Sequence, residues 1–158
     1  MVQALDQAVK DFNKDNQADI ILDIKDIGTF NNKVVFAKVQ ENKSLSRVVR
    51  LTDIIETNCQ TYGVPHCDGN LFNPHITIAK LSRLPFELKG IANIEPTTYN
   101  HYMNYQFGRQ LVTCLQLCAM RKPMDEEGYY HVSHRTQINQ CSNPSHSAEK
   151  ETILYSQK

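Results

Sequence analysis

Hydrophobic side chains recur along the chain with two periods, one typical of helices and one typical of strands. Residues 2–13 carry apolar side chains three and four positions apart, which predicts an amphipathic helix. The run 20–30 alternates as a strand does, and 33–39 forms a second strand-like run. An Asn-Asn pair at 31–32 separates the two runs, and Asn tolerates left-handed backbone. These segments therefore predict a helix followed by a tight hairpin.

A second helix is expected from Ser44 to about Thr61. Ser44 is a good N-cap residue, while Gly63 and Pro65 end the helix. The buried stripe of this helix consists of Leu45, Val48, Val49, Leu51, Ile54 and Ile55. A loop at 63–73 follows.

The second half of the chain continues with strands and short connections. We expect a strand at 75–81, an irregular stretch at 82–93, a short helix from Pro96 to about Tyr105, a strand at 109–120, a polar turn at 122–128, and a partner strand at 129–138. After Asn139 the sequence is polar and without periodicity, which predicts a frayed tail. Hairpins joined by helices indicate an α+β fold with mainly antiparallel sheet.

Composition is that of an ordinary globular domain. The 158 residues favour one domain with a real core, and 22% are charged while 41% are hydrophobic. Seventeen basic and seventeen acidic residues give a formal net charge of zero. The chain therefore has no global charge that would attract nucleic acid or a membrane surface, but a local pocket for a small polar ligand remains compatible.

The five cysteines argue against a disulfide framework. Their number is odd and no Cys-x-x-Cys occurs, which favours a reducing compartment. A zinc site built from Cys59, His66, Cys67 and His75 matches no common ligand spacing, so no metal or cofactor is expected. We expect Cys114 and Cys118 to fill core positions of a strand.

Membrane association is not expected. No apolar stretch approaches the roughly 20 residues of a membrane span. The N-terminus lacks the pattern of a signal peptide, and neither end carries a lipidation motif.

Candidate chemistry concentrates at residues 74–81, Pro-His-Ile-Thr-Ile-Ala-Lys-Leu. In a strand, side chains at i and i+2 share a face, so His75 and Thr77 should lie side by side, with Ile76 and Ile78 anchoring the other face. An imidazole can transfer a proton near neutral pH. A neighbouring hydroxyl can donate a hydrogen bond to a phosphate oxygen. The pair is thus a candidate phosphate-handling site, with His75 and Thr77 as its catalytic residues.

This His-x-Thr strand resembles the second motif of two-histidine phosphoesterases, and further segments are similar to their A-kinase anchoring protein 7-like members. They are the hairpin Asp26–Lys38, the strand Asn73–Ser82, and, in the same order, Ile94–Gly108, Leu117–Met120 and Gly128–His131. The resemblance covers about residues 1–140 and leaves 141–158 as a polar tail. It implies a two-lobed α+β fold with a central cleft and metal-independent handling of nucleotide phosphodiesters.

The resemblance also implies partners and roles. Family members act on 2′,5′-linked oligoadenylates or bind nucleoside monophosphates such as AMP, with one histidine as general base and the other as general acid. The first His-x-Thr of the family would precede the helix at 2–13, so we expect an N-terminally truncated domain with impaired turnover. The alternatives are an inactive AMP-type nucleotide-binding module or a signalling scaffold. The family further implies cytoplasm or nucleus, and we expect a monomer.

Other candidates have simpler interpretations. The tail at 139–158 shows no amphipathic stripe, so docking on a kinase regulatory subunit is not expected through it. A second His-x-Thr at 134–136 has polar flanks, and we interpret it as a chance occurrence. His66, His101 and His131 are interpreted as surface or packing residues. Single cations could line a phosphate site and aromatic rings could stack on a base, although solvated surface and packing are their commoner roles; the candidates are Lys80, Arg83, Lys89, Arg109, Phe30, Phe72 and Tyr130.

Overall fold

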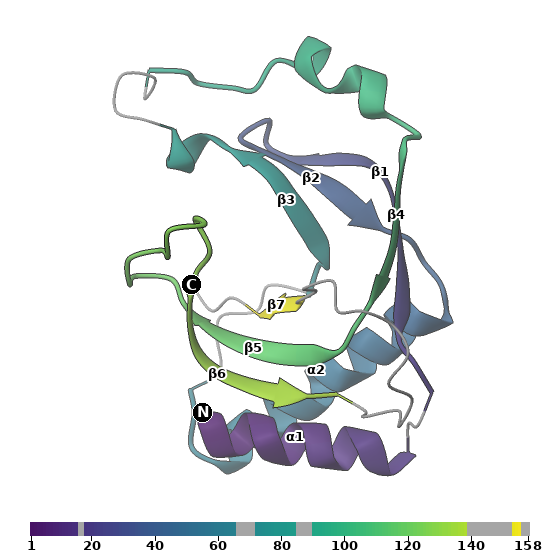
Figure 1. The fold of residues 1–158 in the computed structure, drawn as a ribbon, viewed down its shortest axis with the longest axis vertical. Coiled ribbons are helices and arrows are strands. Elements are labelled where there is room, and N and C mark those ends of the chain that lie inside the picture. Colours follow the sequence, from purple (N-terminus) through teal and green to yellow (C-terminus); the bar gives the residue numbers. More distant parts are fainter. Residues whose placement is uncertain (16–17, 66–71, 85–89, 139–152, 156–158) are drawn as a thin grey trace. The chain divides into compact units, whose positions relative to one another are not determined.

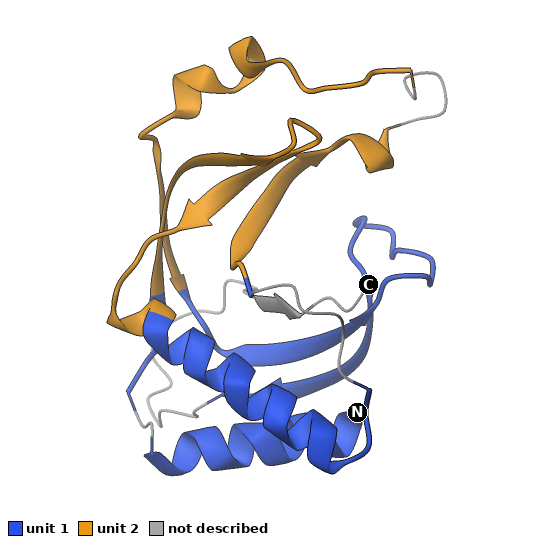
Figure 2. Ribbon diagram, turned by 180° about the vertical axis from the view of Figure 1, so that it is seen from behind, with its two compact units in different colours: residues 1–21, 46–72, 111–158 blue, residues 22–45, 73–110 orange. Residues whose placement is uncertain are grey.

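A computed structural model describes residues 1–15, 18–65, 72–84, 90–138 and 153–155. The chain divides into two compact units, as Figure 2 shows. Unit 1 comprises residues 1–21, 46–72 and 111–158, and unit 2 comprises residues 22–45 and 73–110. Helices and mainly antiparallel sheets confirm the predicted α+β class.

Two helices supply much of the core of unit 1. Helix α1 (Val2–Asp15) and helix α2 (Lys43–Thr61) each bury one stripe, as their periodicity predicts. Fully burying an aliphatic or aromatic side chain contributes about 1.5–3 kcal/mol. The buried stripes are Ala4, Leu5, Ala8, Val9 and Phe12 on α1, and Val48, Leu51, Thr52, Ile55 and Cys59 on α2.

The two ends of α2 are capped by different devices. The prediction of Ser44 as N-cap is wrong, because the Oδ1 of Asn42 accepts the Leu45 N–H at 2.8 Å and the helix begins at Lys43. At the C-terminal end, Gly63 has φ +68° and the Val64 N–H donates to the Cys59 carbonyl at 2.8 Å. This is the glycine-terminated cap that the sequence predicts.

The sheet of unit 1 has the strand order β6-β5-β7. Strands β5 (Cys114–Ala119) and β6 (His131–Gln137) pair antiparallel, whereas β7 (Ile153–Tyr155) pairs with β5 in parallel. The expectation of a frayed tail is therefore wrong for these three residues of β7, whose backbone follows β5 from Leu115 to Leu117. The other residues after 138 lie outside the described part of the chain.

The sheet of unit 2 has the order β3-β2-β1-β4, visible in Figure 1. Its strands are β1 (Ile21–Phe30), β2 (Val34–Val39), β3 (His75–Lys80) and β4 (Gln106–Leu111). The predicted hairpin is confirmed, since Asn31 and Asn32 have φ +51° and +53°. The Lys33 N–H closes the turn by donating to the Phe30 carbonyl at 2.9 Å.

Two sequence predictions in the second half are wrong in detail. The single strand expected at 109–120 is two strands, β4 and β5, because the chain leaves β4 after Leu111 and enters the other sheet at Cys114. The short helix expected from Pro96 consists of separate 3-10 turns at Pro96–Thr98 and Asn100–Tyr102. Tyr, Asn, His and Thr fill this stretch and are modest helix formers, so the proline start signal is not followed by a sustained helix.

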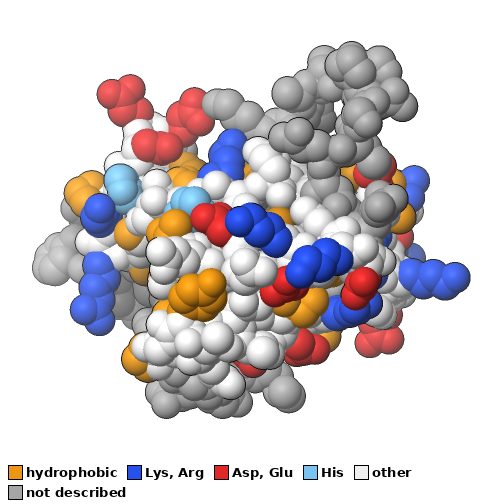
Figure 3. Space-filling view, turned by 90° about the horizontal axis from the view of Figure 1, so that it is seen from below, with side chains coloured by type: hydrophobic (Ala, Val, Ile, Leu, Met, Phe, Trp, Pro, Cys, Tyr) orange, Lys and Arg blue, Asp and Glu red, His pale blue; other side chains and the backbone are white. Residues whose placement is uncertain are grey.

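Charges of both signs are interspersed over the face seen in Figure 3, as equal numbers of acidic and basic residues would suggest. Within the part of the chain that the structure describes, no helix is long and apolar enough to cross a membrane.

Candidate active site

Strand β3 brings His75 and Thr77 to one face of the unit 2 sheet. The two residues are paired with Lys38 and Phe36 of β2, respectively, and both of their side chains are exposed. We call this side of the sheet the motif face. Ile76 points to the opposite side, as predicted, but it is 46% exposed and Ile78 is 53% exposed. The expectation that these isoleucines anchor a buried face is therefore wrong; β3 is an edge strand of its sheet.

The imidazole of His75 is held from two sides. Its Nδ1 lies 2.7 Å from the carbonyl oxygen of Asn73. Because a carbonyl only accepts hydrogen bonds, Nδ1 carries the proton and Nε2 of the neutral ring keeps a lone pair. The ring stands edge-on to Phe30 and Phe36, with centroids 5.0 and 5.1 Å away, and these two phenyl rings stack on each other at 4.3 Å.

A bulge in β3 adds a cation to the motif face. Thr77 pairs with Phe36 and Lys80 pairs with Val34, so three steps along β3 correspond to two along β2, with the shift at Ile78. Strict alternation would place Lys80 on the side opposite Thr77. The bulge instead returns the Lys80 side chain to the side of Phe36 and Thr77.

Asp26 fixes a second cation on the motif face. The Asp26 backbone is left-handed, with φ +72°, at an irregularity in the pairing of β1 with β2. Its Oδ1 accepts hydrogen bonds from the Asn104 and Ile27 N–H groups, at 3.2 and 2.8 Å, and its Oδ2 accepts one from Lys38 Nζ at 3.0 Å. The Asn104 N–H, followed by Lys38 and the Ile27 N–H, holds the pKa of Asp26 below its ordinary value of 3.8. Lys38, which is paired with His75, is thereby oriented beside an ionised carboxylate.

Replacing Asp26 with Asn should show that the ionised Asp26 carboxylate stabilises the fold in a pH-dependent way. A carboxyl whose pKa is lowered in the folded state stabilises the fold at pH values above its unfolded pKa. That contribution is lost as the pH falls through the lower folded pKa. Urea denaturation should therefore show a wild-type advantage over Asp26→Asn that is constant from neutral pH to about 5 and shrinks below about 4. A wild-type advantage that stays the same down to pH 3 would contradict this role of the Asp26 carboxylate.

Gly28 provides the space in which the aromatic pair lies. Gly28 is paired with Phe36 across the hairpin, and a Cβ at this position would overlap the Phe36 ring and lie 3.2 Å from Cε of Lys38. Only a residue without a side chain lets Phe36 lie across β1 while supporting His75.

We expect Gly28→Ala to displace the Phe36 ring and the His75 imidazole that rests on it, and to cost about 1–3 kcal/mol of stability, because the added methyl group overlaps a packed ring. The NMR shifts of the His75 ring and urea denaturation would measure the two effects. Gly90→Ala is the matched control, since a Cβ at Gly90 meets nothing within 4 Å. His75 ring shifts that are the same in both variants and the wild type would contradict this role of Gly28.

Other predicted residues are not part of this site. His134 of the second His-x-Thr lies in unit 1, where its Nε2 contacts Asp6 of α1 at 2.7 Å. His131 lies 3.3 Å from Lys122, and His101 packs on the Tyr102 ring at 4.0 Å. His66, Cys67 and Lys89 lie outside the described residues. Among those that the structure describes, no three His, Cys, Asp or Glu side chains form a metal-binding group.

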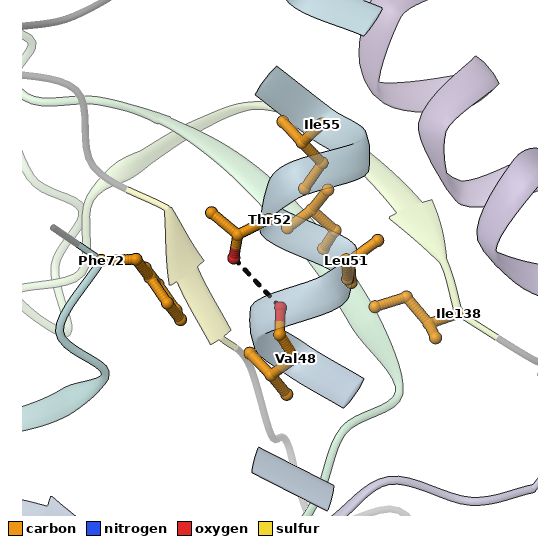
Figure 4. A pocket seen from close by; sticks show the side chains of 7 residues that line it. Val48, Leu51, Thr52, Ile55, Phe72 and Ile138 are labelled. Carbon is orange, nitrogen blue, oxygen red and sulfur yellow. Dashed lines mark hydrogen bonds between the residues drawn. The ribbon is translucent and has the colours of Figure 1, made fainter. Parts of the chain in front are cut away.

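The pocket of Figure 4 offers little polar chemistry. It lies in unit 1 and its lining is apolar apart from the Thr52 hydroxyl, which donates to the Val48 carbonyl at 3.0 Å. Phe72, a sequence candidate for base stacking, lines this pocket and not the motif face. The other lining residues are Leu51, Ile55, Leu115 and Ile138.

Sequence reasoning missed Gly28, Phe36, Lys38 and Asp26 as members of the site. The sequence did contain one signal for the contact between Asp26 and Lys38. These two residues lie at similar distances before and after the hairpin turn at 31–32. An acid and a base so placed are candidates for a cross-strand ion pair.

Comparisons with known proteins identify the family of this chain. The family model described as "AKAP7 2'5' RNA ligase-like domain" matches residues 1–138. Human A-kinase anchor protein 7 isoform gamma is 31% identical over 113 residues, which are 71% of this chain and 32% of that protein. The chain thus spans about a third of the length of this curated relative. These matches show that the chain belongs to the AKAP7 2'5' RNA ligase-like domain family, a phosphoesterase-type family of the two-histidine class.

Proposed function

We propose that this domain binds the phosphate of a nucleotide at His75 and Thr77 and acts there as a phosphodiesterase. The proposal is carried by the placement of this pair, which is exposed on one face of an edge strand. Nδ1 of His75 donates to the Asn73 carbonyl, so Nε2 of the neutral ring is the nitrogen with the lone pair that can accept a proton. Among the described residues, the Thr77 hydroxyl makes no hydrogen bond to the protein and is available to a ligand.

The residues on the motif face can share the work of phosphodiester cleavage. Nε2 of neutral His75 can take the proton of an attacking hydroxyl as a P–O bond forms, and a protonated His75 can give a proton to the leaving oxygen as the other P–O bond breaks. The Thr77 hydroxyl donates to a non-bridging phosphate oxygen. Lys38 and Lys80 lie on the same face, and their ammonium groups stabilise the charge that collects on phosphate oxygens.

For substrate, we propose a 2′,5′-linked oligonucleotide, with nucleoside monophosphates such as AMP as simpler ligands. The support is the family description, which names a 2′,5′ RNA ligase-like domain. The relative's name refers to kinase anchoring, but residues 139–152 and 156–158 of our tail lie outside the described part of the chain, and we propose no anchoring through them. A monomer in the cytoplasm or nucleus completes the proposal.

A second candidate is a module that binds AMP-type nucleotides without turning them over. Two-histidine catalysis needs an acid and a base, and His75 is the one imidazole placed on the motif face among the described residues. A cleavage assay separates this candidate from the first, because it would give binding without products.

Titration of the purified protein with AMP, followed by NMR, tests the common step. Saturable shifts that are lost in His75→Ala and weakened in Thr77→Val would support the site. Chromatographic analysis of 2′,5′-oligoadenylate incubated with the protein then decides between enzyme and binding module. No saturable AMP binding by the folded wild type would overturn both candidates.

A further inference from the structure

We propose that the edge of β5 that faces away from β6 is an acceptor edge for an added strand, and that β7 is its detachable occupant. When β7 leaves, a free peptide with the β7 sequence binds there in the same parallel register. The partner of this surface is thus an extended segment of the chain itself. All of the residues concerned belong to unit 1, so the inference is independent of the function proposed for His75 and Thr77.

The backbone groups of Gln116 are directed toward β7. The Ile138 N–H donates to the Thr113 carbonyl at 2.9 Å, so the backbone of Thr113 faces the β6 side. Backbone groups of successive strand residues point to alternate sides, and the pairing of β5 with β6 is regular over this stretch. Leu115 therefore also faces β6, whereas Gln116 faces β7, where its partner is Leu154.

The side chain of Gln116 holds this part of β5 in place. Gln116 is fully buried, which is unusual for a polar residue. Its side-chain amide lies between the Tyr129 hydroxyl, 2.8 Å away, and the Arg135 guanidinium, whose Nε is 2.9 Å away. Neither neighbour belongs to β7, so the position of Gln116 is set without β7. The acceptor edge is therefore formed before a strand is added to it.

The sequence of β5 favours pairing with a further strand. Cys114–Ala119 reads Cys-Leu-Gln-Leu-Cys-Ala and contains no charged residue, no proline and no glycine. Uncharged segments of this length and composition pair readily with other strands when their edge is open. In the structure β7, drawn in yellow beside β5 in Figure 1, occupies this edge. An unoccupied β5 edge would therefore accept another extended segment that fits the same register.

The backbone pairing that holds β7 is short. β7 has three residues, which is at the lower limit of strand length. It pairs with β5 in parallel, and parallel pairing is slightly less stable per residue than antiparallel pairing. β5 pairs with β6 along its whole length, from Cys114 to Ala119. Because short edge segments open at a free-energy cost below that of global unfolding, β7 can leave while β5 and β6 stay paired.

Amide hydrogen exchange, followed by NMR, tests whether β7 opens on its own. We expect the Gln116 amide, which faces β7, to exchange at least about tenfold faster than the Leu115 amide, which faces β6. In the observed register the N–H of Tyr155 points to β5, and Tyr155→Pro removes it. This variant should accelerate exchange at Gln116 at least about tenfold further and change Leu115 less than about twofold. A general loss of stability in unit 1 would accelerate both amides.

Tyr155→Ala is the matched control for this variant. It removes the same side chain as Tyr155→Pro but keeps the backbone N–H that the ladder uses. Exchange at Gln116 should therefore stay within about threefold of the wild type. Equal acceleration by the alanine and proline variants would mean that backbone pairing does not hold β7 on β5, which would overturn the proposed acceptor edge.

A fluorescent peptide of residues 150–158, added to the full-length protein, tests the acceptor edge directly. Fluorescence polarisation should show that Tyr155→Pro binds this peptide at least about tenfold more tightly than the wild type does. In the wild type the tethered segment competes with the peptide, and only the fraction of molecules with an open edge can bind it. Bound peptide should restore slow exchange at Gln116. The same peptide carrying Tyr155→Pro should bind neither protein.

Three results would overturn the inference. If Gln116 and Leu115 exchange at equal rates in the wild type, β7 does not open independently of the β5–β6 pair. If the peptide binds Tyr155→Pro no more tightly than the wild type, or not at all, β5 is not an acceptor edge. Peptide binding that leaves exchange at Gln116 fast would place the peptide elsewhere on the protein.

Discussion

Turnover of a 2′,5′-oligoadenylate should fall by roughly 10²–10⁴-fold when His75 is replaced with Gln, the range that a positioned general acid or base contributes. Gln keeps a polar amide of similar size, but an amide neither accepts nor releases a proton near neutral pH. The loss should therefore appear mainly in kcat, measured by chromatography of the products, while binding of AMP weakens less.

His101→Gln is the matched control for this experiment. His101 is also an exposed histidine of unit 2, and its ring packs on Tyr102. Its replacement should leave turnover within about twofold of the wild type. Turnover that survives in His75→Gln at the wild-type rate would remove His75 from any catalytic role.

Phe12→Ala should be the most damaging of these changes for stability. Phe12 is fully buried in the stripe of α1, and the Arg47 guanidinium carbon lies 5.8 Å from its ring centroid. Deleting a buried phenyl ring typically costs about 3–5 kcal/mol because it removes apolar burial and leaves a cavity. The total stability of a domain is only about 5–15 kcal/mol, so the urea midpoint should fall sharply.

Val2→Ala on the same helix is the comparison, because Val2 is 43% exposed. Surface substitutions of this kind usually stay within about 0.5 kcal/mol. A loss below about 1 kcal/mol in Phe12→Ala would mean that the α1 stripe does not form a closely packed core.

The sequence predicts best where the cause of structure is local. The stripes of α1 and α2 follow from helical periodicity, and the Asn31-Asn32 turn follows from the backbone preference of Asn. The sequence alone does not decide where α2 begins, since Asn42 and Ser44 are both good N-cap residues. Asn42 serves as the cap in the structure, where its Nδ2 also donates to Asp23 at 2.8 Å, a contact 19 residues distant.

The candidate site was predictable in its centre and not in its surroundings. His75 and Thr77 share a face because no irregularity separates them along β3. Lys80 lies on the same face because of a bulge in β3, and the residue pattern of the strand does not predict this bulge. The break between β4 and β5 was hidden for a similar reason, because Val112 and Thr113 are both good strand residues and the chain changes sheets between them.

The position of β3 at the edge of its sheet affects how the site moves. Within the described residues its ladder is formed with β2 alone, so backbone amides that point away from β2 are open to solvent. Edge segments of this kind open locally at a free-energy cost below that of global unfolding, and the open state lacks the arrangement of His75 against its aromatic neighbours. The observed association constant is then the intrinsic constant multiplied by the fraction of molecules in which β3 is closed. A ligand that binds the closed strand should therefore slow amide hydrogen exchange along β3.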